Sequence, residues 1–274
     1  MEDPFSDTDT ASECGDEEHL PPLILDIFRR EKKIRGLDLD LAAGCELLRQ
    51  LFVTDKQCEG LERATVGQRK NNLWQQHRRG RVTASMVHKI LGAEKGWGDI
   101  AKKIVNGGLS LENIPAVKWG IEKEDSAMQT YVAASNVTHY DFSAESVGLF
   151  IWKEYPFLGA SPDGLRHCSC HGRGLVEIKC PYRFRDVEPF GPHTNGGHYF
   201  LDSNGSLKKS SEYYTQVQFQ MAVVGCDFTD FVVWSPHGCI IETVEKDVSF
   251  CEQLLSTVLD FSFTSLCEEL VGKK

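Results

Sequence analysis

The sequence predicts an α/β (α+β) fold in which helices flank a mixed sheet of about five strands. Two patterns support this prediction: short apolar runs bounded by turn residues gather in the C-terminal half, and longer helical patterns precede and separate them. The third observation is length, because 274 residues with 41% hydrophobic content can bury one substantial core. We therefore expect one large domain, or one domain with an appendage.

The first 66 residues are expected to lie outside the main domain. Residues 1–20 contain eight acidic residues and no Lys or Arg, a composition typical of a disordered tail. Residues 21–66 predict a helical N-terminal extension, with helices over 23–33, 37–52 and 55–65.

The main domain is expected to span residues 67–274. Its expected elements are, in order, a basic helical region over 74–105, a helix over 119–132, strands over 147–152, 157–160 and 175–180, a helix over 213–224, a hairpin of 228–234 and 240–244, and a final helix over 248–270. The apolar run 175–180 is predicted to be the central strand.

Two carboxylates and a lysine lie at the ends of neighbouring apolar runs. Asp163 follows one run within Ser161-Pro162-Asp163-Gly164, and Glu177 and Lys179 lie two residues apart in the next. Residues i and i+2 of a strand share a face, so Glu177 and Lys179 project together. Converging carboxylates beside a lysine suit a hard divalent cation that meets a phosphate, as in phosphodiester cleavage. Taken singly, Glu-x-Lys is usually a solvated ion pair worth ~0–1 kcal/mol, and Pro-Asp-Gly is usually a turn.

Glu124 is a candidate third carboxylate of this cluster. In the predicted helix over 119–132, Ile121, Met128 and Tyr131 form one apolar face, and Glu124 lies on that same face. A carboxylate on a buried face is costly unless it is paired, hydrogen-bonded or bound to metal. The alternative is that Glu124 lies at the edge of the face and extends into solvent.

Five sequence blocks follow one another between residues 68 and 224. They are Trp74-x3-Arg78-x-Gly80 with Val82-Thr83-Ala84-Ser85, Trp119-Gly120-x3-Glu124-x2-Ala127, Ser161-Pro162-Asp163-Gly164-Leu165, Glu177-Ile178-Lys179-Cys180-Pro181, and Tyr213-x2-Gln216-Val217-Gln218. Asp163 followed by Glu177-x-Lys179 is the pattern of the PD-(D/E)XK nuclease superfamily. In this order, the five blocks resemble the phage lambda exonuclease and YqaJ-like viral recombinase family. The resemblance implies a restriction-endonuclease-like core.

The resemblance also implies catalytic roles for individual residues. The metal set would be Glu124, Asp163, Glu177 and Ile178, and it would hold Mg²⁺ or Mn²⁺, with two ions per site. Lys179 would position the attacking water and stabilise charge that develops on the phosphate. Gln216 would orient that water or a metal-bound group.

A second group of residues would bind the terminal 5′-phosphate of the digested strand. By resemblance this group is Arg78, Thr83 and Ser85, and a guanidinium offers a planar fork that suits phosphate. The alternative for Arg78 is a solvated surface arginine. For Ser85 it is the cap of a helix over 86–91, although a cap residue and a phosphate ligand can coincide.

Charge is distributed unevenly along the chain. The formal net charge is −10, but the acidic residues of the first 20 positions account for most of it. Residues 69–103 carry two acidic and nine basic residues: Arg69, Lys70, Arg78, Arg79, Arg81, Lys89, Lys95, Lys102 and Lys103. Such a basic region fits contact with a nucleic-acid backbone; the alternative is an ordinary solvated helical surface.

Together these observations predict a metal-dependent DNA exonuclease that digests duplex DNA ends in the 5′ to 3′ direction, with a role in recombination or repair. Two alternatives stay open: a non-catalytic DNA-end-binding or recombination protein, and a structure-specific or single-strand endonuclease. The resemblance also allows a homo-oligomer, a trimer, and a single-strand-annealing or recombination partner.

The cysteines and the absence of sorting signals indicate a compartment. Ten cysteines without a secretory signal predict reduced thiols in an intracellular protein, cytoplasmic or nuclear and not secreted. No apolar run approaches the ~20 residues needed to span a bilayer, so no membrane partner is expected.

Two loops fall outside these assignments. The loop over 166–174 contains Cys168-x-Cys170-His171, which could supply zinc ligands. Because no second Cys/His pair follows nearby and the C-x2-C spacing is absent, we favour a polar hairpin tip with reduced thiols. The Gly-rich loop over 190–198 could cover the active site or thread a DNA strand; it lacks the Gly-Lys-Ser/Thr of a P-loop.

Overall fold

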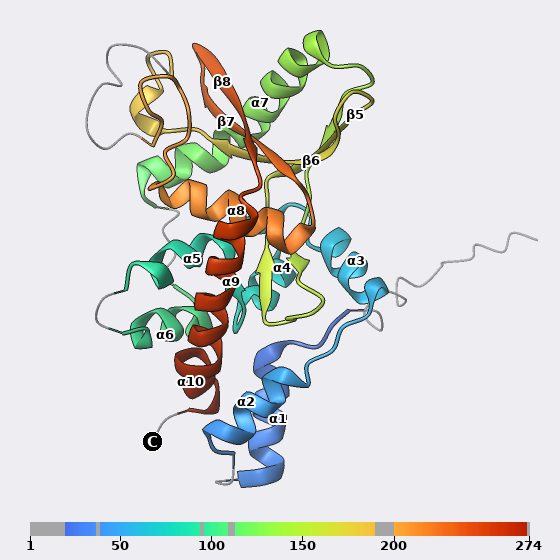
Figure 1. The fold of residues 1–274 in the computed structure, drawn as a ribbon, viewed down its shortest axis with the longest axis vertical. Helices are drawn as coiled ribbons and strands as arrows, with labels where there is room; N and C mark the ends of the chain where they lie inside the picture. The colour runs from blue at the N-terminus through green and yellow to red at the C-terminus, as the bar shows by residue number, and fades with distance from the viewer. Residues whose placement is uncertain (1–19, 37–38, 94–95, 109–112, 190–199, 273–274) are drawn as a thin grey trace, which may run out of the picture.

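The computed structural model describes residues 20–36, 39–93, 96–108, 113–189 and 200–272. The predicted acidic tail, apart from its last residue, and the Gly-rich loop over 190–198 lie outside these residues. In Figure 1 the main sheet and the long helix α7 form the upper part of the molecule, and helices α1, α2, α6 and α10 form the lower part.

The main sheet has five strands in the order β2-β5-β6-β7-β8. They are β2 (Ser143–Glu145), β5 (Gly164–Cys168), β6 (Gly172–Lys179), β7 (Phe228–Ser235) and β8 (Gly238–Glu245). Only the β6–β7 pair is parallel, and the other three pairs are antiparallel. The predicted mixed sheet of about five strands is therefore confirmed, with β6 at its centre.

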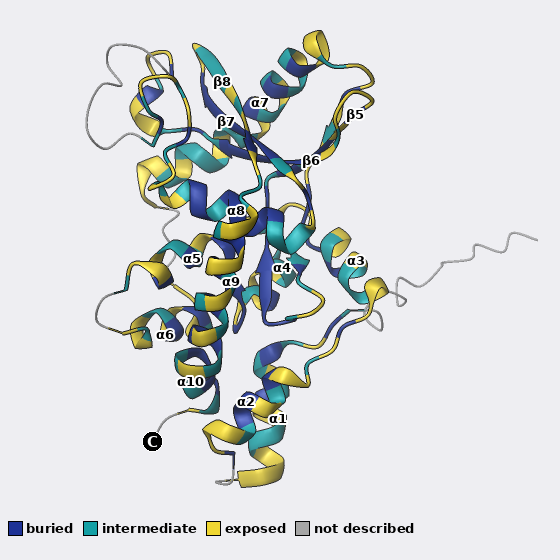
Figure 2. Ribbon diagram, in the orientation of Figure 1, coloured by how far each residue is buried: buried dark blue, intermediate teal, exposed yellow. Residues whose placement is uncertain are grey.

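Helices cover both faces of this sheet, which explains the nearly continuous burial of β6 and β7. Val176 and Ile178 of β6 pack in one cluster with Ala127 and Tyr131 of α7 (Pro115–Thr138). On the opposite face, α8 (Glu212–Val224) packs Met221 on β6 and Val217 on β7. Figure 2 shows β6 and β7 as the most continuously buried strands. The strand period of two thus sends alternate β6 side chains to α7 and to α8.

A second, smaller sheet has the order β1-β4-β3. Strand β3 (Phe150–Ile151) pairs antiparallel with β4 (Leu158–Ala160), as predicted from the two apolar runs, but this pair does not join the main sheet. Its third strand, β1 (Val82–Thr83), lies in a region predicted to be helical throughout, and this prediction was wrong. Gly80, with φ of +78°, turns the chain after the preceding helix, and the Val82 amide then bonds the Phe157 carbonyl.

Six of the remaining helices pack around a large apolar cluster below the main sheet. They are α1 (Ile24–Arg35), α2 (Leu41–Arg49), α5 (Ala84–Leu91), α6 (Gly98–Asn106), α9 (Val248–Phe261) and α10 (Cys267–Val271). Helices α3 (Asp55–Ala64) and α4 (Asn72–Arg78) pack in a smaller cluster with Ile151 of β3, and short helical turns lie at Gln68–Lys70 and Tyr182–Phe184. The predicted final helix is interrupted by a π-helical turn over Ser262–Leu266. None of the helices in the described part of the chain is long and apolar enough to cross a bilayer.

The N-terminal helices share their core with the C-terminal ones. Ile24 and Phe28 of α1 and Leu48 of α2 belong to the same buried cluster as Leu254 of α9 and Leu270 of α10. The predicted helical extension over 21–66 thus packs against the main domain, and its division from residues 67–274 stays a prediction.

Candidate active site

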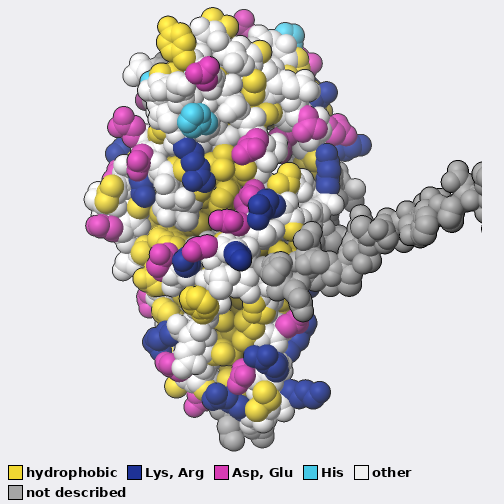
Figure 3. Space-filling view, turned by 90° about the vertical axis from the view of Figure 1, so that its right-hand side faces the viewer, with side chains coloured by type: hydrophobic (Ala, Val, Ile, Leu, Met, Phe, Trp, Pro, Cys, Tyr) yellow, Lys and Arg dark blue, Asp and Glu magenta, His cyan; other side chains and the backbone are white. Residues whose placement is uncertain are grey.

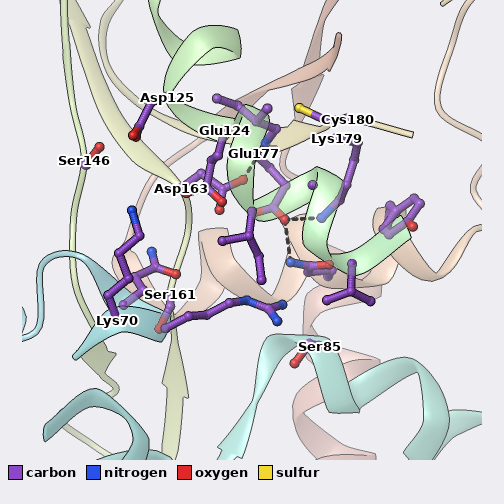
Figure 4. Close-up of a pocket in the computed structure, with 18 of the residues that line it drawn as sticks. Lys70, Ser85, Glu124, Asp125, Ser146, Ser161, Asp163, Glu177, Lys179 and Cys180 are labelled. Carbon is purple, nitrogen blue, oxygen red and sulfur yellow. Dashed lines mark hydrogen bonds and ion pairs between the residues drawn. The ribbon is translucent and has the colours of Figure 1, made fainter. Parts of the chain in front are cut away.

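Asp163 is fixed at the start of β5 by backbone contacts to β6. Its amide donates to the Val176 carbonyl at 3.0 Å, and its Oδ2 accepts the Ile178 amide at 2.6 Å (Figure 4). The next residue must be glycine, because a Cβ on Gly164 would lie 2.9 Å from both the Glu145 carbonyl oxygen and the Met128 methyl group. The turn after Pro162 therefore aims the Asp163 carboxylate at β6.

Glu177 is the most constrained carboxylate of the site. It is 2% exposed, and three donors contact its two oxygens. Lys179 Nζ and Gln216 Nε2 donate to Oε1 at 2.5 and 2.6 Å, and Gln220 Nε2 donates to Oε2 at 2.8 Å. The predicted projection of Glu177 and Lys179 from one face of a strand is confirmed by this contact.

Gln220 is a site residue that the sequence analysis missed. It is fully buried, and it lies one helical turn after Gln216 on α8, so both amides reach Glu177. The spacing Gln-x3-Gln on an otherwise buried helix face was the available signal.

Glu124 extends from α7 into the same pocket (Figure 4). The pocket has a volume of about 500 Å³, and Glu124, Asp163, Glu177, Lys179 and Gln216 all line it. The structure thus brings together the five residues predicted to be catalytic, from α7, the start of β5, β6 and α8. Their catalytic roles stay predictions.

The carboxylates in the pocket destabilise one another's charges. Burial, then the nearby Glu177 and Glu124, raises the pKa of Asp163 well above its ordinary value. Burial and Glu177 raise the pKa of Glu124 in the same way. Burial alone would lower the pKa of Lys179, but the Glu177 and Asp163 carboxylates outweigh it, so the pKa is raised and the ammonium stays charged.

This donor set fits a divalent metal ion. Carboxylate oxygens are the ligands that Mg²⁺ and Mn²⁺ prefer, and a cation would relieve the repulsion that raises the pKa values of Asp163 and Glu124. Ile178 has no ligating side-chain atom and packs in the apolar cluster under α7, so only its backbone carbonyl could contribute to the predicted metal set.

Arg78 forms the other end of the pocket. Its guanidinium carbon lies 4.1 Å from the centre of the Trp74 ring, and its Nη2 donates to Thr83 Oγ1 at 3.1 Å. Trp74 is in turn held by a hydrogen bond of 2.9 Å from its indole nitrogen to Ser161 Oγ. Burial, then repulsion from Arg69, lowers the pKa of Arg78 to about 10, so it remains a cation at neutral pH. This arrangement presents a rigid, partly desolvated cation to the pocket.

The other two predicted phosphate-binding residues differ from each other. Thr83 is buried and its hydroxyl accepts the bond from Arg78, so it can position Arg78. Ser85 is exposed and lines the pocket. The alternative of Ser85 as a helix cap was wrong, because α5 begins at Ala84 and its N-cap residue is Thr83.

The basic region around the pocket is smaller than the sequence suggested. Arg69 and Lys70 line the pocket. Arg81, in contrast, is 2% exposed and donates to the Pro156 and His77 carbonyls, so it stabilises the fold. Lys95 lies outside the described residues. On the face shown in Figure 3, Lys and Arg side chains are interspersed with Asp and Glu side chains.

Comparison with known proteins identifies the family. Residues 73–227, more than half of the chain, match the YqaJ-like viral recombinase domain, and the chain belongs to this family. The alkaline nuclease of Autographa californica nuclear polyhedrosis virus is 26% identical over 260 residues, which cover 84% of this chain and 53% of the viral protein. The chain therefore spans about half the length of this curated relative.

Two solved structures share the fold. The alkaline exonuclease LHK-Exo of Laribacter hongkongensis superposes with a TM-score of 0.53 at 24% identity, over 70% of this chain and 92% of LHK-Exo. The shutoff and exonuclease protein of Kaposi's sarcoma-associated herpesvirus has a TM-score of 0.52 at 13% identity, over 85% of this chain and 75% of the viral chain. The predicted fold class is confirmed by these likenesses.

Proposed function

We propose that this chain is a metal-dependent DNA exonuclease that hydrolyses phosphodiester bonds from duplex ends in the 5′ to 3′ direction, in recombination or repair. The observation that carries the proposal is the convergence of Glu124, Asp163 and Glu177 with Lys179 and Arg78 in one pocket. The names of its relatives, an alkaline nuclease and an alkaline exonuclease, agree with this reaction class.

The three carboxylates would hold Mg²⁺ or Mn²⁺, in two ions per site. Bound there, the metal would polarise a phosphoryl oxygen and lower the pKa of a coordinated water. Gln216 and Gln220 fix both oxygens of Glu177, so this ligand is oriented before any metal binds. Preorganisation of this kind lowers the cost of assembling the site at the moment of reaction.

Lys179 carries the electrostatic part of the mechanism. Its ammonium contacts Glu177 and lies 4.7 Å from the centre of the Tyr213 ring, which limits the directions in which it can move. A charged amine held beside the carboxylates can contact a phosphate oxygen and stabilise the negative charge that grows in the transition state.

Arg78 supports digestion from a 5′ end. A terminal 5′-phosphate carries more charge than an internal phosphodiester, and a fixed guanidinium with the Ser85 hydroxyl in the same pocket can recognise that extra charge. A strand held by its 5′-phosphate at Arg78 would present its first internal phosphodiesters toward the carboxylates. We propose a homo-oligomer, a trimer, as its assembly, and a single-strand-annealing protein as a partner.

The test is hydrolysis of linear and covalently closed circular duplex DNA, with Mg²⁺ or with EDTA. We expect Mg²⁺-dependent release of nucleotides from linear DNA only, and a loss of at least about a hundredfold in Glu177→Ala and Lys179→Ala. The matched controls are Glu122→Ala and Lys118→Ala, whose side chains are exposed on α7 and do not line the pocket.

Each outcome decides a part of the proposal. Full activity in Lys179→Ala would remove this lysine from the mechanism. Cutting of closed circles would discard the exonuclease in favour of an endonuclease. Binding of DNA ends without hydrolysis in any metal would leave a non-catalytic end-binding protein.

A further inference from the structure

A cluster of two cysteines and two histidines lies at the far end of α7 from Glu124. The loop predicted over 166–174 is mostly strand, and between β5 and β6 only three residues form the hairpin tip. Cys168 ends β5, while Cys170 and His171 lie in the tip. His139, the C-cap residue of α7, supplies the fourth side chain.

The four side chains point at a common centre. Their ligand atoms all lie within 4.8 Å of one another. His139 Nδ1 lies 3.3 Å from Cys170 Sγ and 3.7 Å from Cys168 Sγ, and His171 Nδ1 lies 3.6 Å from Cys168 Sγ. The two sulfur atoms are 3.3 Å apart, and both thiols are free.

These separations match a tetrahedral zinc site. With Zn–S of about 2.3 Å and Zn–N of about 2.0 Å, tetrahedral geometry places a sulfur and a nitrogen about 3.5 Å apart and two sulfurs about 3.8 Å apart. The three sulfur–nitrogen distances lie within a few tenths of an ångström of that value, and the two sulfurs need to separate only slightly. Soft thiolates with imidazoles select zinc over the magnesium-type ions that suit the carboxylate pocket.

Contacts outside the cluster hold these residues in place. Ser169, between the two cysteines, donates its amide to the Tyr140 carbonyl at 2.9 Å and its hydroxyl to Asp141 at 2.7 Å, so the tip is bonded to the segment after α7. The His139 amide closes the last turn of α7 by bonding the Ser135 carbonyl. The proximity of the four side chains thus follows from backbone geometry on both sides.

Cys168 has the hydrogen bonds expected around a metal-bound thiolate. Its buried sulfur accepts the His171 amide at 3.2 Å and Arg166 Nη1 at 3.1 Å. Arg166 is itself buried and paired with Asp230 at 3.0 Å, and Asp230 also accepts the Tyr131 hydroxyl at 2.6 Å. Donors that orient a ligand in this way are a general feature of metal sites.

We propose that His139, Cys168, Cys170 and His171 bind one structural zinc ion. Four protein ligands fill the tetrahedral positions and leave none open for water or substrate, so the ion has no catalytic role. The sequence alone favours reduced thiols over zinc, because no second Cys/His pair lies nearby and the C-x2-C spacing is absent. The missing ligand, His139, precedes Cys168 by 29 residues, and the fold brings it to Cys168.

Zinc at this position would brace the frame of the active site. Helix α7 carries Glu124, and the β5–β6 hairpin follows Asp163 and carries Glu177. The ion would fasten the end of that helix to the tip of that hairpin. His139 lies fifteen residues after Glu124, about 22 Å along the helix. The ion would therefore affect the pocket only by fixing α7 relative to the β5–β6 hairpin.

The first test is the metal content of protein purified under reducing conditions without added zinc. We expect about one zinc per chain in the wild type and less than about a tenth in Cys168→Ser/Cys170→Ser and in His139→Ala. His167→Ala is the matched control, because His167 is exposed on β5 next to Cys168 and outside the cluster, and it should keep its zinc.

The second test uses only the wild type, so it holds even where the variants fail to fold. X-ray absorption at the zinc edge should show two sulfur and two nitrogen ligands. A zinc-selective chelator in excess Mg²⁺ should lower the melting temperature and speed alkylation of Cys170, whose thiol is exposed.

Zinc below about a tenth per chain after dialysis against equimolar zinc with reductant would overturn the proposal, whatever the nuclease activity. The proposal would also be overturned if zinc-free protein contained a Cys168–Cys170 disulfide and still bound no zinc after that disulfide had been reduced. Retention of zinc in the double cysteine variant would place the ion elsewhere.

Discussion

Replacing Asp163 by Asn should stabilise the metal-free protein while it abolishes hydrolysis. Burial and the neighbouring Glu177 and Glu124 raise the pKa of Asp163 in the folded state well above its ordinary value. A carboxyl with a raised folded pKa contributes stability that is present below its unfolded pKa and lost as the pH rises through the folded pKa. At neutral pH the charged Asp163 therefore costs stability. Asn removes the charge, and its side-chain oxygen can still accept the Ile178 amide.

The magnitude follows from the linkage between pKa and stability. Each unit by which a folded pKa exceeds the unfolded one is worth about 1.4 kcal/mol, so at pH 7–8 the metal-free Asp163→Asn protein should be measurably more stable than the wild type. For a chain of this size, each kcal/mol of added stability raises the melting temperature by roughly 2–4 °C. Near pH 4 the wild-type carboxyl takes up its proton and the difference should shrink.

Added metal should make the wild type more stable than Asp163→Asn. A ligand at about 100 times its Kd stabilises the folded state by about 2.7 kcal/mol, and the wild type should gain this from Mg²⁺ or Mn²⁺ while Asp163→Asn gains little. The assay is urea or thermal unfolding with EDTA or with metal. Asp227→Asn is the control, because Asp227 is exposed and does not line the pocket. A less stable Asp163→Asn protein in EDTA would show that the Asp163 charge does not destabilise the fold, and an equal response of both proteins to metal would show that Asp163 is not a metal ligand.

Three further predictions concern residues around the pocket. Gln220→Ala should lower kcat by about 10–100-fold with KM for DNA unchanged, because Gln220 only orients Glu177. Gln253→Ala, on the exposed face of α9, should have no effect. A change in KM alone for Gln220→Ala would contradict this prediction. Arg78→Lys should keep DNA binding but lose the preference for 5′-phosphorylated over 5′-hydroxyl ends, measured by competition between the two substrates. Arg81→Met should lower the unfolding free energy by about 2–3 kcal/mol, because two buried carbonyls lose their hydrogen-bond donor. It should leave the salt dependence of DNA binding unchanged. The control, Lys89→Met, should preserve stability.

Much of the carboxylate site could be predicted from local sequence. The strand period of two fixes Glu177 and Lys179 on one face, and the structure places both beside Asp163. The helical period placed Glu124 with the apolar residues of α7, and that face does meet the sheet. These inferences succeed because each depends on a single element whose repeat is visible in the sequence.

The sequence did not predict features that depend on contacts between elements far apart in the chain. A charge run does not show that Arg81 turns inward, because only the fold brings the Pro156 carbonyl to it. The same limit hid His139, whose neighbours at the hairpin tip are set by the pairing of β2 with β5. The third strand of the small sheet, β1, escaped prediction because it is only two residues long and has no repeat to read.

We propose that the pocket between α7, β5, β6 and α8 removes nucleotides from 5′ ends with the help of a divalent metal. The most direct measurement is a digestion time course on a linear duplex with one 5′-phosphate labelled and the opposite end blocked. We expect Mg²⁺-dependent release of the label as a mononucleotide, with none in EDTA or in Glu177→Ala. Release that continues in EDTA, or in Glu177→Ala at the wild-type rate, would contradict it.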